Sequence, residues 1–250
     1  MDYIVFLGTA GARFTVFRQI RASGGIWITL DDTQMLVDPG PGSLVRCLKS
    51  KSKLDPTTLD GIILSHRHLD HSADINVMIE AMTQGGFKPR GAVFVPVDAL
   101  DDDPIIFKYV RKYVPRIDII KEGGEYELKN IKFNTPVRHQ HGGETYGVNF
   151  VSKSHLISYI TDTKYFDRLE TYYPGDVLII NVVRDTPSDI EHLCLMDVKH
   201  IIKQNKPRLA ILTHFGMQMI KLKPWEVAAQ ISADLGIQVI AASDGMKIVL

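Results

Sequence analysis

One short segment limits what this chain can be, and it reads Ser65-His66-Arg67-His68-Leu69-Asp70-His71. It follows the apolar run Leu59–Leu64, which predicts a buried strand, and it precedes a predicted helix over Ser72–Gln84. Four side chains that can bind a metal ion lie within six residues, although the 250-residue chain has only nine histidines. Imidazole and carboxylate groups suit zinc, manganese and iron. The segment therefore predicts a metal site where a strand passes into a helix.

The spacing inside this segment predicts how its ligands divide. Residues i and i+2 of an extended segment point to the same side, so His66 and His68 can bind one ion. Asp70 and His71 come where the chain turns into the helix, and they can face a second ion. A histidine-rich surface loop is the alternative, but it gives no reason for four such residues to cluster.

The rest of the chain mixes hairpins with strand–helix units. The apolar runs Ile26–Leu30 and Gln34–Val37 flank Asp31-Asp32-Thr33 and predict a hairpin, and Pro104–Val114 predicts a helix that begins at a proline. This mixture favours a layered α/β sandwich over a doubly wound sheet or a barrel. No linker, repeat or low-complexity tract is visible, so we expect one domain over residues 1–250.

Composition excludes several classes of protein. The chain has 29 basic and 29 acidic residues, which argues against a general electrostatic affinity for nucleic acid. Its two cysteines, Cys47 and Cys194, are too few for a disulfide framework. We expect no membrane span and no signal peptide, because the chain has no apolar run of 18 residues and its first residues form a strand-like run. A cytoplasmic enzyme is the default expectation.

The pattern His-x-His-x-Asp-His resembles the first metal motif of the metallo-β-lactamase superfamily. Later motifs of that superfamily can be matched at His141 in His139-Gln140-His141-Gly142-Gly143, at Asp162 after His155–Ile160, at His214 after Leu209–Leu212, and at the closing Ser243-Asp244-Gly245-Met246. The resemblance spans nearly the whole chain. It implies a four-layer αββα sandwich.

The resemblance also implies a ligand set for two divalent metal ions, zinc or manganese, with iron as an alternative. The first ion would be held by His66, His68 and His141, the second by Asp70, His71 and His214, and Asp162 would bridge both. His139 is the rival of His141, because the two share one face of an extended segment. Asp38 matches a superfamily aspartate that orients a ligand imidazole, although an aspartate before a proline can equally be a turn residue.

His192 resembles a residue of one branch of the superfamily. It lies in Glu191-His192-Leu193, ahead of a predicted helix, where ribonuclease Z and the PhnP-like cyclic phosphodiesterase of phosphonate breakdown carry a catalytic histidine. Leu7-Gly8-Thr9 is similar to the start of the same group. His192 would be the general acid, since its pKa suits proton transfer near neutrality. A histidine that only bonds backbone at a helix entry is the alternative.

Two departures limit what the resemblance implies about substrate. His141 and Asp162 lie 21 positions apart, which leaves no room for the tRNA-gripping arm of ribonuclease Z, so tRNA is not the expected substrate. Residues 13–25 contain no cysteine, unlike the structural zinc site of the phosphonate-pathway enzyme. Arg13, Arg18 and Arg21 could steer a phosphate or simply be solvated.

The expected function is therefore a binuclear metal-dependent hydrolase acting on a small phosphodiester, cyclic or linear. A hydroxide shared by the two ions would attack, Asp70 would also hold that hydroxide in line, and His192 would protonate the leaving oxygen. A thioester or lactone hydrolase of the glyoxalase II type is the alternative, and a non-catalytic metal-binding domain is the third reading. A homodimer is an expectation of the family alone.

Overall fold

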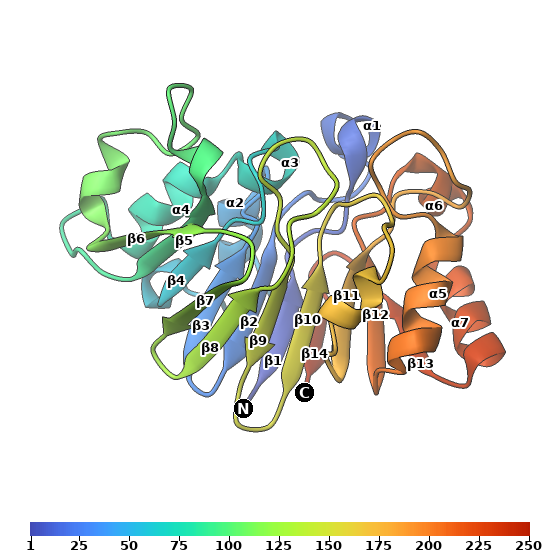
Figure 1. Ribbon diagram of the computed structural model, residues 1–250. Helices are drawn as coiled ribbons and strands as arrows, with labels where there is room; N and C mark the ends of the chain where they lie inside the picture. Colours follow the sequence, from blue (N-terminus) through green and yellow to red (C-terminus); the bar gives the residue numbers. More distant parts are fainter.

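Two seven-stranded sheets lie face to face in the computed structural model, which describes residues 1–250 (Figure 1). The first sheet has the order β14-β1-β2-β3-β4-β5-β6. Its strands are β14 (Lys247–Val249), β1 (Tyr3–Phe6), β2 (Ile26–Leu30), β3 (Thr33–Val37), β4 (Gly61–Ile63), β5 (Ala92–Pro96) and β6 (Arg116–Ile120).

The second sheet has the order β13-β12-β11-β10-β9-β8-β7. Its strands are β13 (Gln238–Ala241), β12 (Leu209–Thr213), β11 (Val177–Asn181), β10 (Leu156–Ile160), β9 (Val148–Val151), β8 (Ile131–Thr135) and β7 (Gly124–Leu128). Both sheets are mixed, since each combines antiparallel pairs with a parallel run of four strands.

Helices cover the outer face of each sheet and confirm the four-layer αββα prediction. Helices α2 (Ser43–Leu48) and α4 (Ile75–Met82) pack on the first sheet, and α5 (Leu195–Asn205), α6 (Met217–Lys221) and α7 (Pro224–Leu235) pack on the second. Two short helices, α1 (Ala12–Phe17) and α3 (Leu69–Ser72), lie at the upper edge in Figure 1. Single 3₁₀ turns cover Pro56–Thr58, Val97–Ala99, Val110–Tyr113 and Leu169–Tyr172. None of the helices has the length and apolarity to cross a membrane.

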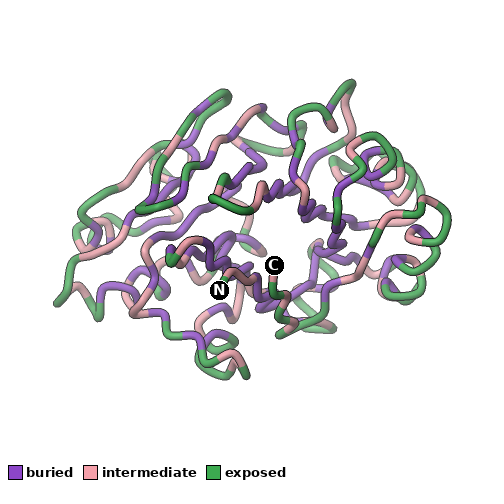
Figure 2. The backbone as a smooth tube through the Cα atoms, turned by 90° about the horizontal axis from the view of Figure 1, so that it is seen from below, coloured by how far each residue is buried: buried purple, intermediate pink, exposed green.

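Strand β1 shows why the central strands are continuous apolar runs. Ile4 and Phe6 point into the core between the two sheets, while Val5 and Leu7 belong to the core between the first sheet and its helices. A strand that is covered on both faces cannot alternate with polar residues. Figure 2 shows the result, with buried backbone through the middle of the molecule and exposed loops around it.

The predicted hairpin is present as β2 and β3. Asp31 and Asp32 both have positive φ values, 44° and 60°, which suit the two-residue turn that matches strand twist. Thr33, expected in the turn, already pairs with Leu30 as the first residue of β3.

The predicted helix over Pro104–Val114 is wrong, because only Val110–Tyr113 forms a 3₁₀ turn. Side chains form hydrogen bonds with backbone N–H and C=O groups that would pair with one another in a helix. Asn76 donates to the carbonyl of Ile105 and accepts from the N–H of Phe107. Arg111 donates from Nε to the carbonyl of Ile106 at 2.9 Å. The predicted helix over Ser72–Gln84 is present but shorter, as α4. No sequence pattern predicted α1, α6, β6 or β7.

The parallel runs bring the carboxyl ends of β3, β4, β10, β11 and β12 to the upper edge in Figure 1. Side chains that follow these strands therefore meet above the core between the sheets. Gly40, just after β3, has backbone packed against it at this edge. A Cβ there would lie 2.0 Å from the Asp70 carbonyl oxygen and 2.2 Å from that of Ser23.

We predict that Gly40→Ala lowers the free energy of unfolding by about 3 kcal/mol, because two backbone carbonyls would have to move. Chemical denaturation measures the effect. Gly123→Ala is the control, since Gly123 has φ +67° but no atom within 4 Å of its Cβ position. It should cost about 1 kcal/mol of backbone strain. Equal losses for the two variants would contradict the packing argument.

Candidate metal centre

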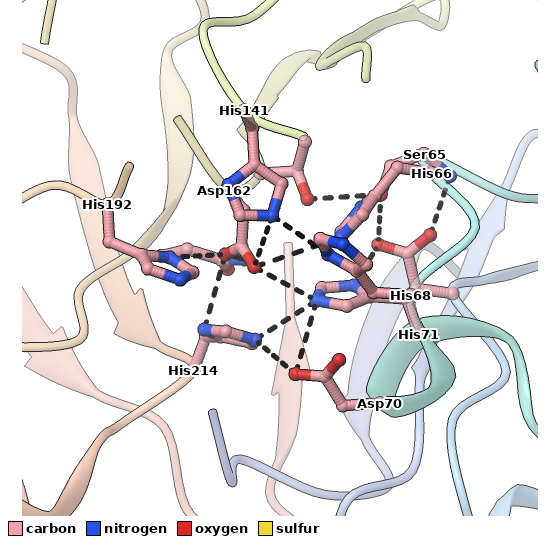
Figure 3. Close-up of polar contacts among 12 residues, drawn as sticks. Ser65, His66, His68, Asp70, His71, His141, Asp162, His192 and His214 are labelled. Atoms are coloured by element: carbon pink, nitrogen blue, oxygen red, sulfur yellow. Dashed lines mark hydrogen bonds and ion pairs between the residues drawn. The ribbon is translucent and has the colours of Figure 1, made fainter. Parts of the chain in front are cut away.

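The residues predicted to bind metal come together at the carboxyl ends of the strands (Figure 3). The loop after β4 supplies His66 and His68, and α3 supplies Asp70 and His71. The other contributors are Asp162 after β10, His214 after β12, His141 from the loop between β8 and β9, and His192 from the loop between β11 and α5. All eight residues chosen from the sequence thus meet in one place.

The candidate ligand atoms form three groups, each within 4.8 Å, and two of these match the predicted ligand sets. His66, His68 and His141 make the first group, and Nε2 of His141 lies 2.9 Å from Nδ1 of His68. The second group contains Asp70, His71, Asp162 and His214. In it, the Nε2 atoms of His71 and His214 are 3.0 Å apart.

Asp162 lies between the groups. Its Oδ2 is 3.9 Å from Nε2 of both His66 and His141, and 3.3 Å from Nε2 of His71. Its Oδ1 is 3.3 Å from Nδ1 of His214. The carboxylate is almost completely buried and faces both sets of imidazoles. This is the position that a bridging ligand requires.

Contacts outside the centre fix the orientation of three imidazoles. Nδ1–H of His71 donates to Oδ2 of Asp38 at 2.9 Å. Ser65 donates its hydroxyl hydrogen to the same oxygen, so its Oγ accepts from Nδ1–H of His66 at 3.0 Å. The carbonyl of Glu191 accepts from Nδ1–H of His141 at 2.8 Å. All three rings therefore direct Nε2 into the centre, as metal-ligating imidazoles do.

Asp38 thus has the position expected of a residue that orients a ligand imidazole. It also accepts from the backbone N–H of Ser65 and from the hydroxyl of Tyr159. Its φ is +53°, and that of His214 is +59°. Each such left-handed residue costs about 1–3 kcal/mol, which the surrounding contacts offset. Two strained residues at one site indicate that its geometry is imposed by the fold.

His139, the rival of His141, points away from the centre. Its Nδ1–H donates to the carbonyl oxygen of Asp162 at 3.1 Å, and its Nε2 accepts from the hydroxyl of Tyr173 at 2.5 Å. Burial lowers the pKa of His139 to about 4, so it stays neutral. Both ring nitrogens are already used, and the geometry therefore favours His141 as the ligand.

Asn181 is a site residue that the sequence analysis missed. It ends β11, and its Nδ2 donates to Oδ1 of Asp162 at 2.9 Å. A polar residue at the carboxyl end of an apolar parallel strand was the available signal. The contact holds the carboxylate so that Oδ2 faces His71.

The centre concentrates charge. Burial raises the pKa of Asp162, but the imidazoles of His214 and His192 outweigh it and bring that pKa well below its usual range. Burial lowers the pKa of His71, but the carboxylates of Asp70 and Asp38 raise it well above its usual range. The acidic groups therefore attract positive charge into this buried space.

The donor set fits a metal ion. Nε2 of His66 and Nδ1 of His214 are buried and have no hydrogen-bond partner, and both face Asp162. Buried polar atoms without partners are costly and rare. Cations among these nitrogens and carboxylates would satisfy them.

The three arginines near the site differ in their contacts and exposure. Arg21 donates to the Thr9 hydroxyl at 2.9 Å and lies over the ring of Phe215, so it holds the fold together. Arg13 and Arg18 are exposed. Asp244, in the closing segment matched from the sequence, accepts from both the backbone and the hydroxyl of Thr9.

A family profile described as a β-lactamase superfamily domain matches residues 33–215, most of the chain. The chain belongs to the metallo-β-lactamase superfamily. The match includes every residue of both ligand groups, and it confirms the resemblance inferred from the motifs.

Two other proteins resemble the chain over most of its length. An uncharacterized protein of Methanocaldococcus jannaschii is 32% identical, over 99% of this chain and 94% of its own. The Bacillus subtilis protein YhfI, described as a probable metallo-hydrolase, is 24% identical over 77% of this chain and 80% of its own. Its crystal structure gives a TM-score of 0.82 at 19% identity, covering 99% and 98% of the two chains.

A diphosphatase of the PhnP family has a TM-score of 0.73 at 18% identity, covering 100% of this chain and 98% of its own. Similarity at this identity shows a shared fold. The superfamily membership and the description of YhfI support the prediction of a metal-dependent hydrolase.

We predict that Asp38→Asn weakens metal binding about 10- to 100-fold, because the ring of His71 loses its carboxylate acceptor. Competition with a chromogenic chelator measures the affinity. Asp60→Asn is the control, since Asp60 accepts the N–H of Gln34 at 2.9 Å at the opposite end of the same sheet. An unchanged affinity in Asp38→Asn would show that the contact does not support the centre.

The two neighbouring histidines should respond differently to alanine. His141→Ala should remove a bound ion with little effect on folding. His139→Ala should leave the ion count unchanged but lower the free energy of unfolding by about 1–3 kcal/mol, since buried polar groups of Asp162 and Tyr173 lose their partner. Elemental analysis and urea denaturation measure the two quantities. The reverse pattern would make His139 the ligand.

Proposed function

We propose that this protein is a two-metal phosphodiesterase that cleaves a small phosphodiester, with His192 as general acid. The position of His192 carries the proposal. Its Nδ1 lies 3.6 Å from Oδ1 of Asp162, and its ring centre is 4.9 Å from that of His141. It lies outside the two predicted ligand groups, although its ligand atom also lies within 4.8 Å of those of His141 and Asp162. An extra imidazole beside the centre is free to transfer a proton.

The chemistry of the leaving group favours a phosphodiester. An alkoxide is a poor leaving group and needs a proton as the bond breaks, whereas a thiolate, whose conjugate acid has a pKa of about 8.5, can leave without one. Burial lowers the pKa of His192, but the Asp162 carboxylate outweighs it and raises that pKa above its usual value. The protonated form that a general acid needs is thereby favoured.

Two ions held by these residues would lower the pKa of a bound water to about 7 and neutralise the phosphoryl oxygens. Asp162 would keep the two ligand groups together. Asp70 is partly exposed at the edge of the second group and would orient the attacking water. His192 would hold the proton destined for the leaving oxygen.

Two observations support a small substrate instead of tRNA. The interval between His141 and Asp162 is filled by β9 and β10, which are interior strands of the second sheet. The net charge of zero gives no general attraction for a polyanion.

The first experiment compares bis(p-nitrophenyl) phosphate with p-nitrophenyl phosphate and a thioester, using protein reconstituted with Zn²⁺ or Mn²⁺. We expect the diester to be cleaved, the activity to disappear on chelation, and Asp162→Ala to be inactive. Cleavage of the thioester alone would assign the protein to the glyoxalase II-like branch. No turnover of any substrate by fully loaded protein would favour a non-catalytic domain.

The role of His192 predicts a dependence on the leaving group. His192→Ala should slow cleavage of a diester with an alkoxide leaving group about 10²- to 10⁴-fold. The loss should be much smaller for p-nitrophenolate, which leaves without a proton. Turnover of the two substrates measures the difference, and His200→Ala, an exposed histidine on α5, is the control.

Metal content separates this role from ligation, because the ligand atoms of His192, His141 and Asp162 also lie within 4.8 Å of one another. His192→Ala should retain its full metal content. A lost ion, or equal losses for the two leaving groups, would make His192 a ligand and contradict the proposal.

A further inference from the structure

Large apolar side chains are exposed around the mouth of the metal centre. On α1, Phe14 and Phe17 are 63% and 64% exposed, and Leu69 on α3 is 73% exposed. Met196, at the start of α5 after the His192 loop, is 63% exposed. We call Phe14, Phe17, Leu69 and Met196 the apolar rim. Apolar surface gathered at a functional site indicates binding.

The rim is attached directly to the residues of the centre. The segment leading into α1 rests on His214, since a Cβ at Gly11 would lie 2.3 Å from Nδ1 of that ring. Leu69 immediately precedes Asp70, and α3 packs beside α1. Figure 1 shows α1, α3 and the loop before α5 along the same upper edge of the sheets. A molecule bound at the centre would therefore lie within reach of the rim.

Packing against the core does not explain why helix α1 forms. Only Thr15 of its six residues is buried. A helix of this length has little stability of its own. The rings of Phe14 and Phe17 nevertheless form a pair with centroids 5.4 Å apart, facing outward. The pair adds nothing to the packing of either sheet.

The charge around the mouth is uneven. No acidic residue lies between Asp2 and Asp31, and α1 and the residue after it expose Arg13 and Arg18. Beside β5, in contrast, Asp101, Asp102 and Asp103 are exposed, and Asp103 pairs with Arg67 at 3.0 Å. An anionic ligand at the centre is therefore favoured on the α1 side of the mouth and disfavoured beside the acidic loop.

We propose that the substrate is a phosphodiester with an apolar substituent, alkyl or aryl, which rests on Phe14 and Phe17 while the phosphate lies at the metal centre. This inference depends on the proposed phosphodiesterase function. Arg13 and Arg18 favour the anionic phosphate on this side of the mouth. The rim thus selects among small diesters by their apolar group.

The test compares methyl and hexyl p-nitrophenyl phosphate, which share a leaving group and are used as dissolved monomers. Burial of part of the hexyl chain should give the wild-type protein a kcat/KM at least about tenfold higher for the hexyl ester. Phe14→Ser/Phe17→Ser should reduce this ratio to about 2. Phe87→Ser/Phe107→Ser, at two exposed phenylalanines on another surface, should keep it. Thermal denaturation checks that each variant is folded.

A wild-type ratio near 1, or a full ratio in Phe14→Ser/Phe17→Ser, would overturn the inference. If neither diester is cleaved, the proposed function is wrong. Calorimetry then tests the inference separately, by comparing the affinities of the protein for hexyl phosphate and methyl phosphate. Tighter binding of hexyl phosphate that needs Phe14 and Phe17 would support it, and equal affinities would overturn it. Binding to phosphatidylglycerol vesicles that needs the two rings, with no preference among dissolved diesters, would assign the rim to a membrane surface and overturn the proposal.

Discussion

The carboxylate of Asp38 connects the two sheets directly beneath the metal centre. It follows β3 in the first sheet, where it accepts from Ser65 and His71, and it also accepts from the hydroxyl of Tyr159 in β10 of the second sheet. The same group therefore joins the two sheets at this edge and fixes the direction in which His71 points. This contact thereby supports the arrangement in which the two ligand groups face each other across Asp162.

The sandwich gives such contacts their precision. Parallel strands of both sheets end at one edge, so each ligand leaves a rigid element and needs only a short loop to reach the centre. The fold also maintains unfavourable local geometry there, with positive φ at Asp38 and His214. Buried nitrogens without partners add to the cost. Metal binding would compensate both, so we expect the centre to be among the parts of the fold most stabilised by its ions.

The sequence predicted best those site residues whose positions depend on neighbouring residues in the chain. The first motif sets its ligands by spacing alone, and the other ligands follow apolar runs whose ends could be recognised. Asn181 and the pair His139–Tyr173 depend on which strands become neighbours, which one sequence does not show. The prediction of a helix over Pro104–Val114 was wrong for a similar reason. The side chain of Asn76, which is distant in sequence, forms hydrogen bonds with backbone groups of this segment. Helix α1 could not be predicted from a pattern of buried residues, because its apolar side chains face outward.

We propose that each of the two ligand groups holds one ion and that Asp162 joins them. Anomalous scattering from crystals grown with Zn²⁺ or Mn²⁺ tests it most directly. The account predicts two peaks, one among His66, His68 and His141 and one among Asp70, His71 and His214, with Asp162 between them. A single peak, or a peak coordinated by His139 in place of His141, would contradict it.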